Sequence, residues 1–272
     1  MCLFLVWFFV PALFGQVPTE ELNTLLMHST FRIIGPAKVA DRNSFGTVFF
    51  MGIPSSDDPK HGRLVLVTAA HVLDDIGGDV ATLTMRRRSI DGSYTTFDYN
   101  FKIRDAGKNL YIKHADADVA AMYIEVPPDL PITTLTPNFL ADDERIEQLE
   151  IHPGDKILYL GFPLFAMTRG GFPFLREGTL ASYPLTPVHS VKEWNFDGLL
   201  YGGNSGGPVY FHYENRYRQG GTQWGFDQGI LGLVVQQINS SIPEFADKQL
   251  NYGVIVPAQF IKETLDNLTR GH

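Results

Sequence analysis

The sequence predicts an all-β fold with one helix near each end, on three observations. Of the 272 residues, 44% are hydrophobic and 19% are charged, which is typical of a globular chain that buries a large core. The 26 glycines and 17 prolines exceed the usual share and indicate many turns between short strands. Beyond residue 18 the hydrophobic pattern mostly has a period of two, as in antiparallel β-structure.

Two helices are expected, one after Pro18 and one after Pro257, a residue type favoured in the first turn of a helix. In each helix three apolar residues share one face: Leu22, Leu25 and Leu26 in the first, and Ile261, Leu265 and Leu268 in the second. Between the helices, strand follows strand. The expected strands span residues 30–34, 46–51, 63–68, 79–87, 94–103, 119–126, 156–161, 178–183, 208–211 and 230–236.

The stretch from 127 to 153 interrupts this rhythm of strands. It contains four prolines, Pro127, Pro128, Pro131 and Pro137, and then a charged run at 142–150. Such a stretch is the natural connection between two β-halves. We therefore expect an N-terminal half at residues 28–130 and a C-terminal half at residues 150–268.

The N-terminus predicts a cleaved export signal at residues 1–15, and hence a periplasmic or extracellular location. Residues 3–10 form an unbroken apolar run, which is followed by Pro11 and by the small residues Ala12 and Gly15. A membrane-spanning helix needs about 20 apolar residues, so we expect no stable membrane span. No Lys or Arg precedes the run, which leaves an uncleaved anchor or a buried N-terminal strand as alternatives.

Charge and cysteine content exclude several classes of function. The 22 Lys and Arg against 30 Asp and Glu leave a net charge of −8, the wrong sign for binding phosphate backbones, so no nucleic-acid partner is expected. The only cysteine is Cys2, which excludes a disulfide framework, a thiolate zinc site and a cysteine nucleophile. Histidines such as His114, His152 and His212 have no metal-ligand spacing. We expect neither a metal nor a cofactor.

Three short segments contain residues suited to nucleophilic catalysis. They are Thr-Ala-Ala-His at 68–71, Asp-Ala-Asp-Val-Ala at 116–120 and Gly-Asn-Ser-Gly-Gly-Pro at 203–208. A serine hydroxyl needs a neutral imidazole to take its proton, and the imidazole needs a carboxylate to hold its tautomer. His71, Asp118 and Ser205 supply these groups. The glycines let the backbone turn and aim the amides of Gly203 and Ser205 at the oxyanion of a tetrahedral intermediate.

At these segments the sequence resembles the trypsin-like (chymotrypsin-fold) serine proteases, in the bacterial branch typified by HtrA peptidases. The family's motifs are TAAH, an Asp-apolar-Ala strand start and G-[DN]-S-G-G-P, in this order. Similar segments at 44–49, 154–161, 231–236 and 253–256 extend the resemblance over about residues 28–268. It implies two six-stranded antiparallel β-barrels with a C-terminal helix, and a serine endopeptidase that forms an acyl-enzyme on Ser205.

The resemblance also decides between two candidate acids. Asp116 lies two residues from Asp118, on the same face of an extended strand. Asp118 is preferred because Val119 and Ala120 follow it, as the family pattern requires. The chain departs from the family at two points. Asn204 replaces the aspartate that pairs with a newly cut N-terminus in animal digestive proteases, and the chain ends soon after the last helix, so no PDZ domain is expected.

The resemblance places four residues at the substrate. The residue six before the nucleophile lies at the base of the family's primary specificity pocket, which is Leu199 in this chain. Tyr201, Val235 and Gln236 are expected beside it. The pocket is then apolar, and the expected partner is a protein or peptide cleaved after apolar residues. No pattern in the sequence indicates an oligomeric state.

Two other classes of function remain as alternatives. Gly203, Ser205 and Gly207 also match G-x-S-x-G, the nucleophile elbow of α/β-hydrolase esterases. That motif needs a helix directly after the serine, whereas residues 208–211 are expected to form a strand, and only His212 and His272 follow as possible bases. The other alternative is a protease-like binding module that has lost a triad residue. All three triad positions are present here, which favours the enzyme.

Overall fold

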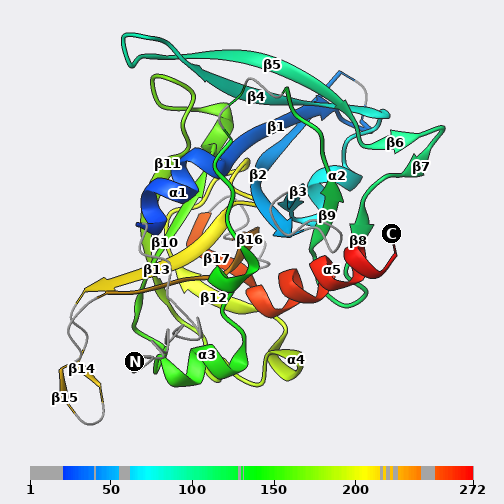
Figure 1. Cartoon of the computed structure of the whole chain (residues 1–272). Coiled ribbons are helices and arrows are strands. Elements are labelled where there is room, and N and C mark those ends of the chain that lie inside the picture. Colours follow the sequence, from blue (N-terminus) through cyan, green and yellow to red (C-terminus); the bar gives the residue numbers. More distant parts are fainter. Residues whose placement is uncertain are drawn as a thin grey trace, which may run out of the picture.

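Two β-structures, one after the other along the chain, make up most of the protein (Figure 1). The computed structural model describes residues 21–271, apart from 40, 55–61, 128–129, 131, 215–216, 219–220, 223–225 and 240–248. The predicted export signal at residues 1–15 lies outside the described residues. Within the described ranges, no helix is long and apolar enough to cross a membrane.

The first half is an antiparallel sheet of seven strands in the order β5-β4-β1-β2-β3-β9-β8. Its strands are β1 (Thr30–Pro36), β2 (Asn43–Pro54), β3 (Gly62–Thr68), β4 (Val80–Arg88), β5 (Tyr94–Lys102), β8 (Ile112–Lys113) and β9 (Ala120–Tyr123), and a separate ribbon contains β6 (Arg104–Asp105) and β7 (Lys108–Asn109). The period-two pattern explains β5, where Phe97, Tyr99 and Phe101 turn to the less exposed face while the residues between them are exposed.

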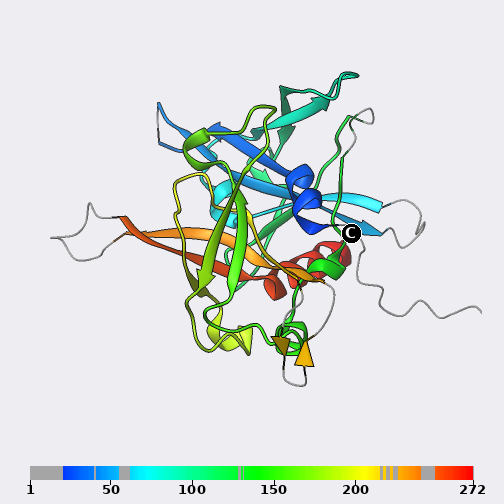
Figure 2. The same ribbon diagram turned by 90° about the vertical axis from the view of Figure 1, so that its left-hand side faces the viewer.

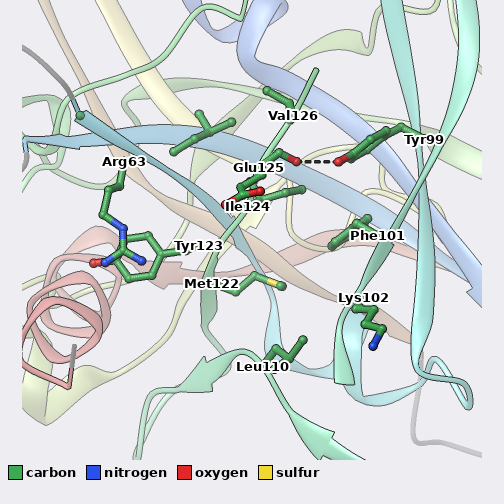
Figure 3. A pocket seen from close by; sticks show the side chains of 12 residues that line it. Arg63, Tyr99, Phe101, Lys102, Leu110, Met122, Tyr123, Ile124, Glu125 and Val126 are labelled. Atoms are coloured by element: carbon green, nitrogen blue, oxygen red, sulfur yellow. Dashed lines mark hydrogen bonds between the residues drawn. The ribbon is translucent and has the colours of Figure 1, made fainter. Parts of the chain in front are cut away.

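This half does not close into the six-stranded barrel that the resemblance implies. Closure would need β5 to pair with β9, and the described strands contain no such pairing. The short strand β8 pairs with β9 at Ala120 and Ala121 instead, and so occupies the edge that β5 would use. Beyond β8 the two edges stay apart around a cavity of about 790 Å³ (Figure 3). The Tyr99 hydroxyl spans this gap by donating to the Glu125 carbonyl at 2.7 Å. The prediction of a second closed barrel is therefore not confirmed.

The second half is a closed barrel of six strands, as predicted, in the order β10-β11-β12-β17-β16-β13. The strands are β10 (Lys156–Gly161), β11 (Phe174–Leu180), β12 (Trp194–Asp197), β13 (Pro208–Glu214), β16 (Phe226–Asn239) and β17 (Gln249–Pro257), and β14 (Tyr217–Arg218) with β15 (Gly221–Thr222) forms a small ribbon. Large side chains such as Tyr159, Phe196 and Phe211 fill the barrel. Trp194 is fully buried, and its indole N–H donates a hydrogen bond to the Leu185 carbonyl at 3.0 Å.

Both predicted helices form. The structure contains α1 (Leu22–Ser29), α2 (Ala70–Asp74), α3 (Asp143–Gln148), α4 (Val188–Val191) and α5 (Ala258–Arg270), with short 3₁₀ turns η1 (Pro137–Phe139) and η2 (Pro163–Phe165). α5 begins directly after Pro257 and buries an apolar stripe that includes Ile261, Leu265 and Leu268. Between the halves, the predicted connection contains η1 and α3, which Asp142 caps by accepting from the Arg145 N–H at 3.1 Å.

The two halves share one hydrophobic core. It joins residues of the first sheet, such as Phe49, to barrel residues such as Tyr210 and Val254 and to Phe260 of α5. α5 contacts β8 and β9 of the sheet and β16 and β17 of the barrel, and Figure 2 shows it running between the two halves. Helix α1 also connects them, because the main-chain N–H of Leu22 donates to Gln228 Oε1 at 2.9 Å. This shared core holds loops from both halves next to each other.

Candidate active site

His71 lies in the first turn of α2, three residues after β3 ends at Thr68. The buried Thr68 hydroxyl donates to the Thr47 carbonyl at 2.7 Å, which ties the end of β3 to β2. Ala69 and Ala70 follow and are almost fully buried. Small side chains at these two positions let the chain turn from strand into helix against the core, so the Thr-Ala-Ala-His segment sets the position of the imidazole.

Asp118 contacts His71 through both carboxylate oxygens. It lies in the tight turn before β9, where the N–H of Val119 donates to the Ala117 carbonyl at 2.8 Å. Asp118 Oδ2 is 2.5 Å from His71 Nδ1, and Asp118 Oδ1 accepts from the main-chain N–H of His71 at 2.9 Å. Because an ionised carboxylate can only accept, Nδ1 carries the ring proton. This leaves Nε2 as the nitrogen that can take a proton from another group.

The other candidate acid, Asp116, has a different partner. Its carboxylate is 63% exposed and lies 3.4 Å from the Lys192 ammonium group. Its main-chain N–H donates to His114 Nδ1 at 3.1 Å. The structure therefore brings Asp118 to His71 and leaves Asp116 at the surface.

The surroundings of His71 favour its protonated form. Burial of the ring disfavours the charge, but the hydrogen bond that His71 donates to Asp118 and the charges of Asp118, Asp75 and Asp74 outweigh it, so the pKa of His71 is raised above its ordinary value. For Asp118, burial again opposes the charged form. The hydrogen bonds and charge of His71 prevail and lower the pKa of this carboxyl. The pair is thus suited to stabilise an imidazolium that forms during a reaction.

Ser205 lies in a glycine-rich turn ahead of β13. Gly203 and Gly206 have φ angles of 99° and 84°, a left-handed conformation that glycine adopts readily. The Ser205 hydroxyl donates to the Val235 carbonyl over a long distance of 3.4 Å. His71 and Ser205 line the same cavity of about 220 Å³. Within the described part of the chain, no hydrogen bond joins their side chains.

Close packing explains why glycines surround Ser205. A Cβ atom on Gly206 would collide with the Thr47 carbonyl and the Thr68 hydroxyl, and one on Gly207 would collide with the Leu160 carbonyl. The main-chain N–H of Thr47 also donates to the Ser205 carbonyl at 2.8 Å. The turn is therefore pressed against β2, β3 and β10, at the junction of the two halves.

Two N–H groups of this turn are unused. Among the described residues, the main-chain N–H groups of Gly203 and Ser205 donate to no acceptor, whereas that of Asn204 donates to the Tyr201 carbonyl at 3.2 Å and that of Gly206 to the Val234 carbonyl at 2.7 Å. Unpaired N–H groups beside a nucleophile are suited to bind a negatively charged oxygen.

The cavity beside Ser205 is lined by two of the predicted pocket residues, Tyr201 and Val235. Leu199 does not line it: this side chain is 39% exposed and its carbonyl accepts from the Tyr159 hydroxyl at 2.8 Å. Leu200, which is 1% exposed, lines the cavity instead. Neighbours in an extended chain point to opposite sides, so an offset of one residue exchanges an inward side chain for an outward one.

Gln236, the fourth predicted pocket residue, pairs with Val254 in the β16–β17 register, and its side chain lies outside the described residues. Sequence reasoning also missed two residues of the site. Val234 lines the cavity, and Thr47 holds the serine turn through main-chain and side-chain hydrogen bonds. The run at 44–49 singled out the segment around Thr47, but nothing in its pattern indicates which side chain reaches the turn.

No metal site is evident in the described ranges, which contain no cluster of three or more histidine, cysteine, aspartate or glutamate side chains arranged to hold an ion.

Comparison with known proteins gives little beyond a loose likeness. No protein-family model matches the chain, and neither does any curated protein sequence. Among solved structures, the chain is similar to the active form of the Rv3671c protease from M. tuberculosis. The two are 17% identical, the match covers 95% of this chain and 94% of that one, and the TM-score is 0.49. A similarity at this level assigns no activity, so the function must follow from the geometry of the site.

Proposed function

We propose that the protein is a serine endopeptidase in which Ser205 attacks the substrate, His71 transfers protons and Asp118 orients His71. The observation that carries the proposal is the double contact of Asp118 with His71, in a cavity that Ser205 shares. A carboxylate bound to both the ring and the main chain of one histidine fixes the ring's orientation and tautomer, which general-base catalysis requires. The two unpaired N–H groups beside Ser205 complete the set of groups that acyl transfer needs.

The reaction begins when Ser205 Oγ leaves the Val235 carbonyl. A single long hydrogen bond holds it there, and rotation about χ1 connects the staggered positions of a serine. Oγ then attacks the carbonyl carbon of the peptide bond while its proton passes to His71 Nε2. The carbonyl oxygen becomes an oxyanion, which the N–H groups of Gly203 and Ser205 bind. Asp118 remains ionised and stabilises the imidazolium.

The tetrahedral intermediate collapses when the C–N bond breaks and His71 Nε2 gives its proton to the departing amine. The acyl group is now an ester on Ser205. A water molecule gives a proton to His71 Nε2 and attacks the ester carbonyl through the same oxyanion site. Release of the carboxylic acid returns the proton to Ser205, so neither a metal nor a cofactor takes part in the cycle.

The pocket favours small or medium apolar residues before the cleaved bond. Apolar walls come from Leu200, Val234 and Val235, and none of the described residues that line the cavity is acidic. A buried Lys or Arg without a partner would cost several kcal/mol. A Cβ atom on Gly253 would collide with Leu200, which shows that Leu200 packs closely over the barrel at this point. We expect Val, Ala or Leu at the position before the cut.

We also propose that the protein belongs to the trypsin-like serine proteases, in the HtrA-like branch. The support is the order of the three motifs along the chain, together with a closed six-stranded barrel and a C-terminal helix. We also propose that the protein is exported and that its N-terminal signal is cleaved. Mass spectrometry tests this on the N-terminus of the protein produced in its natural host. An intact Met1 would contradict cleavage.

A fluorophosphonate probe, which reacts only with an activated serine, tests the proposed mechanism. The wild-type protein should be labelled on Ser205 and should cleave unfolded casein, whereas Ser205→Ala should do neither and should unfold at the same temperature. A peptide library analysed by mass spectrometry then reads the preference before the cut. Cleavage by Ser205→Ala at the wild-type rate would refute the mechanism, and predominant cleavage after Lys or Arg would refute the pocket. If the probe failed to label the wild-type protein and the protein still bound peptides, the result would support a binding module.

A further inference from the structure

Two peptide planes carry the N–H groups that we assign to the oxyanion. One joins Gly202 to Gly203 and the other joins Asn204 to Ser205. In a trans peptide the N–H and the C=O point in opposite directions, so a hydrogen bond that fixes the carbonyl also fixes the direction of the N–H. The Asn204 carbonyl accepts from the N–H of Gly207 at 2.9 Å. This second plane is therefore held from within the glycine-rich turn itself.

The first plane is held from a distant part of the chain. The Gly202 carbonyl accepts from the main-chain N–H of Leu164 at 2.7 Å. Leu164 lies in the loop between β10 and β11, which contains η2. This contact holds the Gly202 carbonyl on the side of the loop. The Gly203 N–H, at the opposite side of the same peptide plane, therefore points away from the loop. The adjoining Gly203 carbonyl accepts from the Thr47 hydroxyl at 2.7 Å, which fixes the next plane as well.

Leu164 adopts a backbone conformation that leucine rarely takes. Its φ and ψ are 49° and 41°, and Phe165 follows with a φ of 65°. Two successive non-glycine residues in the left-handed region are uncommon and cluster at functional sites. Packing of the Leu164 side chain does not explain the conformation, because this residue is 64% exposed. What the conformation does provide is an N–H aimed at Gly202.

Contacts on both sides of Leu164 hold the loop in this shape. The Phe165 ring lies on the Phe45 ring with centroids 3.6 Å apart, and the Phe165 carbonyl accepts from Arg32 Nη1 at 3.1 Å. On the other side, the N–H of Phe162 donates to the Thr47 hydroxyl at 3.3 Å. The loop is thus attached to β1 and β2 of the first half.

We infer that Leu164 is a positioning residue: its main-chain N–H, presented by the left-handed turn, holds the Gly202–Gly203 peptide so that the Gly203 N–H faces the oxyanion. The inference rests on the proposed function. It predicts that the backbone conformation at Leu164 matters for turnover and that the leucine side chain does not.

Two substitutions separate these effects. Leu164→Gly keeps the N–H and favours a positive φ, so kcat should stay within about twofold of wild type. Leu164→Val also keeps the N–H and an apolar side chain, but a β-branched residue strongly disfavours a positive φ. Its kcat should fall by about 10²-fold, the effect of misplacing or losing one oxyanion donor, with KM within about threefold of wild type.

Affinity for a peptide aldehyde provides a second readout. The aldehyde forms a hemiacetal with Ser205 whose oxygen occupies the oxyanion site, so Leu164→Val should weaken its binding in parallel with kcat and leave product-peptide binding unchanged. If Leu164→Val fails to fold, Phe165→Ala is the substitute variant. It removes the stack on Phe45 and should also lower kcat. Melting temperatures of all variants check their folding.

Wild-type kcat in a folded Leu164→Val protein would overturn the inference, and so would an equal loss in Leu164→Gly, since the side chain would then matter. Both results differ from failure of the proposed function, in which the wild-type protein itself would resist fluorophosphonate labelling. That outcome would remove both proposals.

Discussion

Asp118 is the residue on which the proposed chemistry depends most directly. Its two oxygens bind the ring and the main chain of His71, so loss of one negative charge affects both the orientation and the proton position of the imidazole. Asp116, two residues earlier, has the same side chain but is exposed and lies beside Lys192. The chain therefore contains its own control for the role of this carboxylate.

Replacing Asp118 by Asn should lower kcat by about 10⁴-fold, because an amide that donates to Nδ1 stabilises the wrong tautomer. Asp116→Asn should leave kcat within about twofold of wild type, since an exposed ion pair contributes little. Steady-state kinetics on a peptide substrate measures both. If the two effects were reversed, the orienting role would pass to Asp116.

The pH dependence of kcat/KM reports on His71. The reaction needs the neutral imidazole, so activity should rise with pH as His71 loses its proton. Because Asp118 and neighbouring carboxylates raise the pKa of His71, the midpoint should lie above the ordinary value of about 6.5. Lowering the charge with Asp75→Asn should move the midpoint to lower pH. A wild-type midpoint below the ordinary value would contradict the assigned environment.

At the scale of elements, one buried arginine connects helix α1 to both halves. Arg86 on β4 is 7% exposed and donates to the carbonyls of Met27, His28, Thr30 and Gly171 at 2.9 to 3.2 Å. Its guanidinium carbon also lies over two aromatic rings, 4.2 Å from the Phe31 centroid and 4.5 Å from that of Phe172. Burial lowers the pKa of Arg86 to about 9. The carbonyls and rings replace the counter-ion that a buried cation usually requires.

Replacing Arg86 by Met should lower the free energy of unfolding by about 3 kcal/mol, because four carbonyls lose a charged donor. Arg88→Met, at an exposed position on the same strand, is the matched control and should change it by less than about 0.5 kcal/mol. Urea denaturation measures both values. Equal stability of the two variants would show that Arg86 does not hold α1 in place.

The loop between β10 and β11 connects helix α1 to the proposed oxyanion site. The segment between β10 and β11 makes two of the contacts described above. The Gly171 carbonyl accepts from Arg86, and the N–H of Leu164 donates to the Gly202 carbonyl. The carbonyl that accepts from the cation fixing α1 and the N–H that orients the proposed oxyanion site thus belong to one continuous loop. A change in α1 docking is expected to reach the site through this loop.

At the scale of the whole molecule, the site forms only where the two halves meet. The first half provides His71 and Asp118, and the second provides Ser205 and the apolar cavity. The shared core under α5 holds the halves together. The halves differ in closure, because β8 occupies an edge of β9 in the first and no such strand interrupts the described barrel in the second.

The amino-acid sequence alone determined the β-rich class and both terminal helices, whereas the six-stranded barrel of the second half was expected only from the resemblance to a known family. Hydrophobic periodicity and turn residues are local signals, and they act over a few neighbours in the chain. The sequence also singled out His71 and Ser205, since each lies in a short segment whose chemistry is recognisable without knowledge of distant contacts, and the family resemblance preferred Asp118 over Asp116.

Only the tertiary structure decided the features that depend on residues far apart in the chain. The open first sheet follows from competition between β8 and β5 for one edge, the cavity wall falls on Leu200 rather than Leu199 by an offset of one residue, and the Gly202 carbonyl meets the N–H of Leu164. The last contact is between main-chain atoms. Every non-proline residue has the same N–H and C=O groups, so no pattern of side chains can indicate which of them will meet.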